Sequence, residues 1–207
     1  MPLLTASDVT IERGDRRLLA DVNLTVSAGQ IWQLVGANGV GKTSLMRALA
    51  GLARLGVEGQ IERQAELLYL GHASALKPSL NAMENLRCHP ASDVMASDDD
   101  IERALAAVSL AGHEERPVGA LSAGQQRRVA LARLLVSPAR LWLLDEPFTA
   151  LDSSGCDWLD EQIQQHVEAG GGLIFTSHQP SRFGSRQIDL ELACLLYTSP
   201  SPRDLLK

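Results

Sequence analysis

Residues 36–44 read Gly-Ala-Asn-Gly-Val-Gly-Lys-Thr-Ser and fit the pattern of a phosphate-binding loop, in which spaced glycines precede a lysine and a hydroxyl residue. The apolar run 31–35 comes just before this stretch and predicts a buried parallel strand. Apolar residues then recur at helical spacing, at Leu45, Met46, Leu49 and Leu52. Strand, loop and helix thus follow in the order that turns backbone N–H groups at a helix N-terminus towards phosphate oxygens. We therefore expect an α/β fold built around a nucleotide site.

The chemistry of such a loop gives its residues distinct expected roles. Lys42 would reach the β- and γ-phosphates of ATP, and the Thr43 hydroxyl would enter the coordination shell of Mg²⁺. The alternative is a chance glycine-rich turn before a helix, which the flanking strand and helix patterns argue against. The predicted nucleotide contacts in the loop are Gly36, Ala37, Asn38, Gly39, Val40, Gly41, Lys42, Thr43 and Ser44.

Composition limits the classes of function. The 207 residues, 45% of them hydrophobic, can bury a full core in one domain. A net charge of -6 gives no support for a nucleic-acid partner bound through its phosphates. The 3 cysteines stand alone, which indicates a reducing compartment without disulfides or a zinc site. No apolar run approaches the roughly 18 residues of a membrane span, so we expect any membrane role to come through a partner.

The first part of the chain predicts a small antiparallel unit followed by a helical one. Residues 6–12 and 17–27 each indicate a strand, and the turn-rich segment 13–16 between them predicts an antiparallel pair. Residues 66–70 form a second apolar run after the loop helix. From residue 73 to 137 the pattern is mostly helical, which predicts an inserted helical subdomain.

Two further stretches carry candidate chemistry. Residues 121–125 open a helix with small residues at its N-terminus, a second potential phosphate site. The apolar run 141–144 delivers Asp145 and Glu146 at the carboxyl end of a strand. Asp145 would hold Mg²⁺ through water, and Glu146 would polarise the attacking water. The alternative is that these acids merely end a strand.

The last predicted elements are a helix over residues 157–167 and an apolar strand over 173–175. Glycines 170–172 separate the two elements. His178 follows the strand, which predicts that it lies at the same sheet edge as Glu146. Taken alone, His178 would more often be an ordinary strand-end histidine.

Taken together, these motifs resemble the series found in ATP-binding-cassette ATPases, which have a P-loop NTPase core. The resemblance covers residues 3 to about 192 and rests on Gly36 to Thr43, Leu121 to Gln125, Leu141 to Glu146, Ala150-Leu151-Asp152 and His178. It implies one ATP-binding domain over residues 1–193. It also implies a head-to-tail dimer in which two ATP molecules lie between the phosphate loop of one subunit and the signature helix, opened by residues 121–125, of the other.

That dimer gives several residues an implied role. Ser122, Gly124 and Gln125 would bind ATP in trans. Asp152 would lie near the dimer seam, and His178 would contact the γ-phosphate.

Two positions depart from the usual pattern of these ATPases. His72 takes the place of a glutamine at the junction with the helical subdomain, and we expect it to couple nucleotide state to partner subunits. Arg13 takes the place of the aromatic residue that stacks on adenine. Since a guanidinium plane can also stack on a base, Arg13 is either that contact or a solvated turn residue.

With these departures, the motifs resemble the haem-exporter ATP-binding subunits of bacterial cytochrome c maturation. The resemblance implies a peripheral protein on the cytoplasmic face of the inner membrane, working with membrane-spanning exporter subunits. ATP hydrolysis would drive haem export or release of a haem-loaded chaperone. An ATPase for another transported cargo and a soluble regulatory cassette without transport remain alternatives. The pair Cys88-His89 does not predict haem attachment, because the required second cysteine position holds Asn85.

The last residues, 194–207, stop resembling this family and look like a translated adaptor sequence. We expect them to lie outside the native fold.

Overall fold

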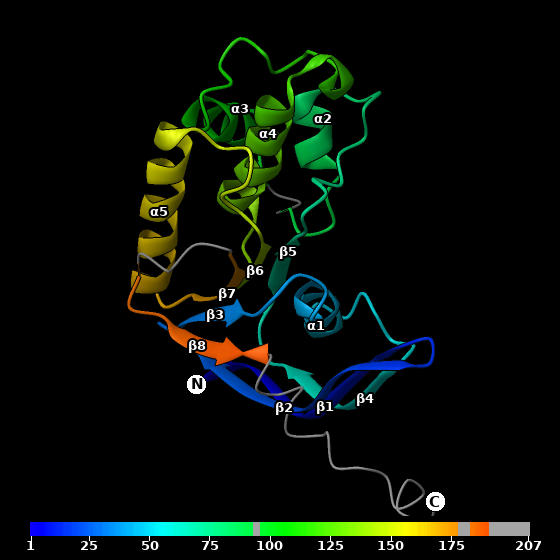
Figure 1. The fold of residues 1–207 in the computed structure, drawn as a ribbon. Coiled ribbons are helices and arrows are strands. Elements are labelled where there is room, and N and C mark those ends of the chain that lie inside the picture. The colour runs from blue at the N-terminus through cyan, green and yellow to red at the C-terminus, as the bar shows by residue number, and fades with distance from the viewer. Residues whose placement is uncertain (93–95, 178–182, 191–207) are drawn as a thin grey trace, which may run out of the picture.

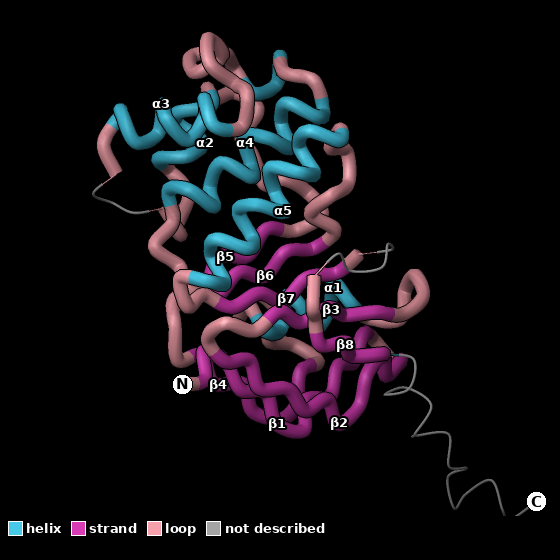
Figure 2. Tube along the Cα trace, turned by 90° about the vertical axis from the view of Figure 1, so that its left-hand side faces the viewer, coloured by secondary structure: helices cyan, strands magenta, loops and turns pink. Residues whose placement is uncertain are grey.

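The computed structural model describes residues 1–92, 96–177 and 183–190, so the segment 194–207 and His178 lie outside the described residues. Within them the chain forms an antiparallel sheet, a parallel sheet and a group of helices (Figure 1). The helices α2 to α4 gather beyond the β5 end of the parallel sheet, and the antiparallel sheet lies beyond its β8 end (Figure 2).

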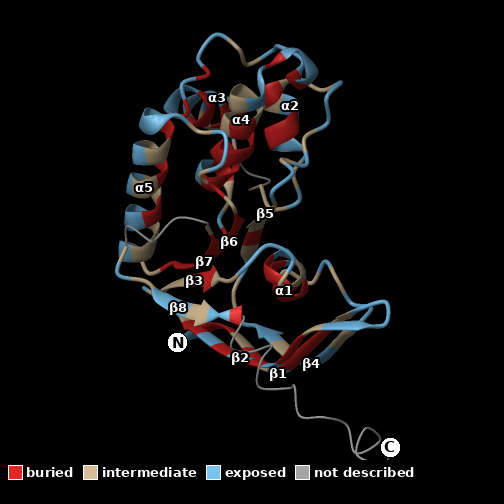
Figure 3. Ribbon diagram, viewed as in Figure 1, coloured by how far each residue is buried: buried red, intermediate tan, exposed pale blue. Residues whose placement is uncertain are grey.

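The parallel sheet has the strand order β5-β6-β7-β3-β8. Its members are β3 (Ile31–Val35), β5 (Leu67–Leu70), β6 (Leu141–Asp145), β7 (Gly172–Thr176) and β8 (Arg186–Asp189). The central strands β6 and β7 are buried along their whole length (Figure 3), as their apolar sequences predict. Because all the strands run in parallel, the ends of β3, β6 and β7 meet at one edge of the sheet, where Asp145 pairs with Thr176 in register.

The antiparallel sheet has the order β2-β1-β4. Strands β1 (Pro2–Arg13) and β2 (Arg16–Ser27) confirm the predicted pair and its turn. Strand β4 (Val57–Arg63) was absent from the sequence-based prediction, and so was β8. Both are mostly exposed edge strands, so neither shows the apolar pattern that marks a buried strand.

The helices confirm the predicted helical region, with one corrected boundary. Helices α2 (Ala82–Arg87), α3 (Asp98–Ala107) and α4 (Ala123–Val136), with the 3₁₀ turn η1 (Val118–Ala120), share one buried cluster. Helix α5 (Ser153–Glu168) begins before the predicted residue 157. The reason is that the Asp152 side chain accepts a hydrogen bond from the Gly155 N–H and caps the helix.

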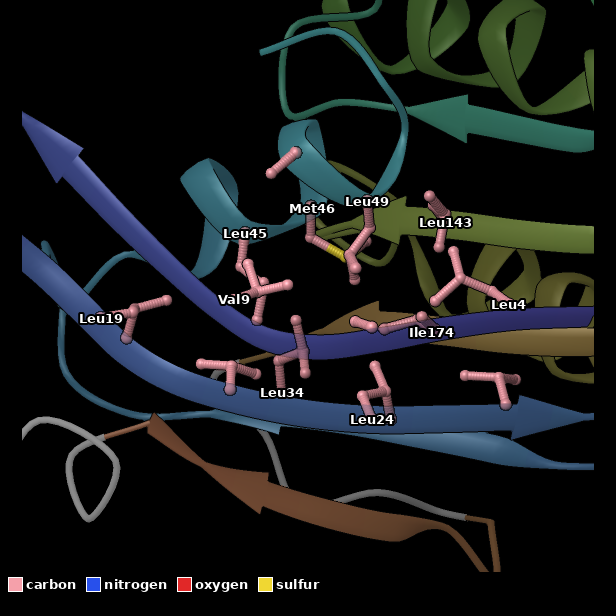
Figure 4. Close-up of a cluster of buried hydrophobic side chains, with 14 of the residues drawn as sticks. Leu4, Val9, Leu19, Leu24, Leu34, Leu45, Met46, Leu49, Leu143 and Ile174 are labelled. Carbon is pink, nitrogen blue, oxygen red and sulfur yellow. The ribbon is translucent and has the colours of Figure 1, made fainter. Parts of the chain in front are cut away.

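One hydrophobic cluster joins helix α1 (Lys42–Leu49) to both sheets (Figure 4). It includes Leu45, Met46 and Leu49 of α1, Val9, Leu19 and Leu24 of the antiparallel sheet, and Leu143 and Ile174 of the parallel sheet. This packing fixes the N-terminus of α1 beside the end of β3. Within the described residues, no helix combines the length and the apolar character that crossing a membrane requires.

Candidate functional site

The loop between β3 and α1 has the backbone of a phosphate cradle. Gly36, Gly39 and Gly41 adopt φ values of 142°, 81° and 120°, which L-residues with a side chain rarely adopt. A Cβ at Gly41 would also lie 3.1 Å from Leu19 Cγ, so a larger residue there would require the Leu19 side chain on β2 to shift. Helix α1 begins at Lys42, with no side-chain cap and no acidic residue in its first turn. Its N-terminal amides and dipole therefore suit an anion.

Lys42 is held over this loop. The residue is largely buried, and its Nζ donates to the carbonyl oxygens of Gly36, at 2.7 Å, and Ala37, at 3.2 Å. The ammonium is thus kept beside the amides that begin α1. This arrangement places two kinds of positive group together, as phosphate binding requires.

A chain of hydrogen bonds connects the phosphate loop to two strand ends. Thr43 Oγ1 donates to Asp145 Oδ2 at 2.8 Å, and Thr176 Oγ1 donates to Asp145 Oδ1 at 2.7 Å. The backbone N–H of Glu146 in turn donates to Thr176 Oγ1 at 2.8 Å. The sequence predicted Thr43, Asp145 and Glu146 but missed Thr176, although that residue directly follows the predicted strand 173–175. Its hydroxyl therefore holds both the Asp145 carboxylate and the backbone of Glu146 at the start of the next turn.

Glu146 has an unusual backbone. Its φ of 50° lies in the left-handed region, which costs a residue with a side chain about 1–2 kcal/mol. Such a conformation persists only where the surroundings enforce it. The Thr176 contact to the Glu146 N–H is one of the restraints that do so.

The oxygen donors at this edge suit Mg²⁺. Thr43 supplies a hydroxyl and Asp145 a buried carboxylate, joined at 2.8 Å. In the part of the chain that the structure describes, no cluster of three or more His, Cys, Asp or Glu side chains could form a protein-only metal cage. Mg²⁺ usually takes one or two protein oxygens and completes its shell with water and substrate phosphates. The donor set therefore fits Mg²⁺ that arrives with a nucleotide.

A cleft of about 390 Å³ brings most of the predicted residues together. Of the predicted contacts in the loop, Gly36, Ala37 and Val40 do not line the cleft. Arg16 and Leu18 line it without having been predicted, because only the fold carries the start of β2 to the loop. Exposed Arg13 and exposed His72 also face it. The lining residues are Arg13, Arg16, Leu18, Asn38, Gly39, Gly41, Lys42, Thr43, Ser44, His72, Asp145 and Glu146.

The residues predicted to act in trans lie elsewhere. Ser122, Gly124 and Gln125 do not line the cleft, and they form the start of α4. There Ser122 Oγ accepts from the Gln125 N–H at 3.2 Å, and Gln125 Oε1 accepts from the Ser122 N–H at 2.9 Å. This capping box presents the helix N-terminus at the surface.

Asp152 is also outside the cleft. Arg128 Nη2 donates to Asp152 Oδ1 at 2.6 Å and joins the start of α5 to α4. The Gly155 amide, with help from the charge of Arg128, holds the pKa of the exposed Asp152 carboxyl below its ordinary value. Asp152 is therefore an ionised cap.

We expect Thr176→Val to lower the free energy of unfolding by about 1–3 kcal/mol, because it leaves Asp145 and the Glu146 N–H without their shared partner. ATP turnover should fall as well, since both neighbours lie at the cleft. Thr176→Ser keeps the hydroxyl and is the matched control. Denaturant unfolding measures the stability, and phosphate release measures the turnover. Equal stability and equal turnover in the valine and serine variants would contradict this role.

Comparisons with known proteins agree with this geometry. The family model described as "ABC transporter" matches residues 19–149. The chain is 47% identical over 192 residues to the "Cytochrome c biogenesis ATP-binding export protein CcmA" of Alcanivorax borkumensis, covering 90% of this chain and 87% of that protein. The protein of the same name from Escherichia coli K12 is 43% identical over 199 residues, which cover 91% of this chain and 95% of the Escherichia coli protein.

Solved structures share the fold. A putative ABC transporter ATP-binding protein from Pyrococcus furiosus superposes with a TM-score of 0.75 at 21% identity, covering 92% of this chain and 98% of that one. A putative metal-chelate type ABC transporter in an inward-facing conformation gives a TM-score of 0.69 at 23% identity, covering 87% and 75% of the two chains. At such identities the likeness concerns the architecture alone.

Proposed function

The chain belongs to the ABC transporter family and is an ATPase of that type, and we propose that it is the ATP-hydrolysing subunit of a membrane complex for cytochrome c biogenesis. ATP hydrolysis would drive haem export or release of a haem-loaded chaperone. The observation that carries the ATPase chemistry is the hydrogen-bonded chain from Thr43 through Asp145 and Thr176 to Glu146. The names and identities of the relatives support the assignment to cytochrome c biogenesis.

Each part of the site has a proposed task in hydrolysis. Lys42 and the first amides of α1 bind the phosphates of ATP and neutralise their charge. Thr43 and Asp145 would hold Mg²⁺, which when bound would offset the negative charge that develops on the phosphate. The Glu146 carboxylate orients the attacking water and accepts its proton. His178, which comes two residues after β7 in the sequence, is proposed to contact the γ-phosphate.

We propose one ATP-binding domain over residues 1–193 and a head-to-tail dimer. In that dimer Ser122, Gly124 and Gln125 complete the ATP site of the partner subunit. Support comes from their position at the exposed start of α4 and outside the cleft of their own chain. Asp152 would lie near the seam. Arg13 and its neighbour Arg16 line the cleft and are available to a nucleotide base by stacking.

The partners we propose are membrane-spanning haem exporter subunits, which would hold this chain as a peripheral protein at the cytoplasmic face of the inner membrane. The test is affinity capture of the protein from native membranes. We expect cytochrome c maturation subunits to co-purify with it. Recovery of a different permease would instead favour another cargo, and recovery of no membrane protein would favour a soluble regulatory cassette. The capture should be repeated with the Glu146→Gln variant, because that variant should stabilise the ATP-bound dimer.

We propose that His72 couples ATP hydrolysis in this chain to the membrane-spanning partner subunits. It lines the nucleotide cleft and also a neighbouring groove of about 560 Å³ that includes Ser74 and Ala75. A side chain shared by both hollows can respond to nucleotide and to a docked partner. Imidazole is a poorer ligand for Mg²⁺ than an amide oxygen, so the contact of His72 with the site is expected to run through water or a hydrogen bond.

We expect His72→Ala to lower the ratio of partner-stimulated to basal ATPase rate by about fivefold or more, because a coupling free energy of ordinary size corresponds to that factor. His72→Gln should retain part of the stimulation, since its amide can also form hydrogen bonds. The measurement compares both variants with the parent, with and without reconstituted partner subunits. Ratios that match the parent in both variants would exclude a coupling role.

A further inference from the structure

Arg127 joins segments that are far apart in the sequence. It lies on α4 and is only 4% exposed. Its Nη1 donates to the Gly71 carbonyl at 3.1 Å, and its Nη2 donates to the Glu146 carbonyl at 2.9 Å. Gly71 directly follows β5, and Glu146 directly follows β6. One guanidinium therefore connects the signature helix to two neighbouring strand ends of the parallel sheet.

The position of this guanidinium is strongly specified. Burial lowers the pKa of Arg127, and the carboxylates of Asp145 and Glu146 oppose that effect. A buried cation is tolerated only where its hydrogen bonds are well formed, and the planar fork of arginine fits two acceptors at once. A guanidinium in this setting fixes the two carbonyl groups relative to each other.

Glu146 is consequently held from both sides. The Thr176 hydroxyl holds its N–H at 2.8 Å, and Arg127 holds its carbonyl at 2.9 Å. Between these two contacts its backbone keeps the left-handed φ of 50°. Arg127 does not line the nucleotide cleft, whereas Glu146 does, so Arg127 would act on hydrolysis from outside the cleft, through its contact with Glu146 and through its charge.

We propose that Arg127 is a positioning residue for Glu146, holding the backbone of the general base in its left-handed conformation and tying it to the Gly71–His72 loop. The inference rests on the proposed ATPase role of Glu146. A change in the position of α4, whose first residues would meet ATP in the partner subunit, would move the Glu146 carbonyl through this contact. The site would then be fully formed only when α4 is in place.

Arg133 offers a matched control on the same helix. It is 2% exposed and donates to the Ser74 carbonyl at 2.8 Å and the Ala75 carbonyl at 3.1 Å. Like Arg127 it is a buried cation that anchors the loop after β5, but its hydrogen bonds do not include Glu146. Arg127→Met and Arg133→Met therefore each remove one buried cation from α4, and only Arg127→Met also removes contacts to the Asp145 and Glu146 carbonyls and a charge near those carboxylates.

The experiment measures turnover, ATP affinity and melting temperature for both variants of the full chain. We expect Arg127→Met to lower kcat by about 10- to 100-fold, because a small misplacement of a reacting group slows the chemical step by that much. The Kd for ATP should stay within about twofold of that of the parent. Arg133→Met should lower the melting temperature similarly and leave kcat within about threefold of the parent. Equal losses of kcat in the two variants would overturn the proposal.

A double-mutant cycle separates positioning from general destabilisation. In a Glu146→Gln background, Arg127→Met should cause no further fall in single-turnover rate, because the base it positions is gone. If the fold-losses of rate in the two single variants multiply in the double variant, Arg127 acts independently of Glu146. If Arg127→Met does not fold, Arg127→Lys takes its place. Lysine keeps the positive charge but cannot contact both carbonyls in the way that the guanidinium does. A kcat equal to that of the parent in Arg127→Lys would count against the proposal. An inactive parent chain would instead refute the proposed function itself.

Discussion

Glu146→Gln is expected to retain MgATP and to slow hydrolysis by about 10²- to 10⁴-fold, the range that a general base usually contributes. Glutamine matches glutamate in size but cannot accept the proton of the attacking water. The backbone contacts of residue 146 to Thr176 and Arg127 do not involve the side chain, so the local fold should be retained. Single-turnover hydrolysis with the membrane partners present measures the rate, and calorimetry measures the ATP affinity.

The same variant tests the proposed dimer. If ATP binds between two subunits and hydrolysis releases them, blocking hydrolysis should trap the ATP-bound dimer, which light scattering can detect. Glu161→Gln is a matched control, because Glu161 is an exposed residue of α5 that does not line the cleft. Near-normal turnover of Glu146→Gln would remove this residue from the role of base and would also remove the reason for Arg127 to position it.

The sequence was most informative for the strands of the parallel sheet that are rich in apolar residues. The strands β3, β5, β6 and β7 are central or apolar, so their residue types alone indicated them. The strands β4 and β8 could not be found in this way, since both are edge strands with mostly exposed side chains. Their pairing is decided by the neighbouring strands β1 and β3, which supply the hydrogen bonds.

The residues of the candidate site also divide into those that local sequence indicates and those that only the folded structure identifies. Lys42, Thr43, Asp145 and Glu146 follow from local motifs, because each sits at a fixed place in a strand, loop or helix. Arg127 could not be recognised: an arginine in a stretch of good helix formers looks like part of a solvated face, and only the packing of α4 on the sheet buries it. Thr176 gained its role from register alone, since it pairs with Asp145 across β6 and β7. Asp152 had a local signal that was overlooked, a side-chain cap on α5.

Lys42→Ala is expected to weaken ATP binding by about 10- to 100-fold, the size of a lost hydrogen bond to a charged group, and to lower turnover at saturating ATP as well. The ammonium neutralises phosphate charge both before and during hydrolysis, so its loss affects both stages. This pattern differs from that of Glu146→Gln, which should affect the rate alone. Calorimetry and steady-state kinetics on the same preparation separate the two.

Lys42 also has a structural contact, and the controls must account for it. Its Nζ bonds to the Gly36 and Ala37 carbonyls, so alanine could loosen the loop without any effect on phosphate charge. Lys42→Gln retains a donor for these carbonyls and removes the charge; Lys77→Ala removes an exposed lysine away from the cleft. If charge is what matters, glutamine should behave like alanine, and both should reduce the rise in melting temperature that ATP gives the parent and Lys77→Ala. Parental ATP affinity in the alanine and glutamine variants would count against residues 36–44 as a phosphate loop, because a loop that binds phosphate through this ammonium must lose affinity when the charge is removed.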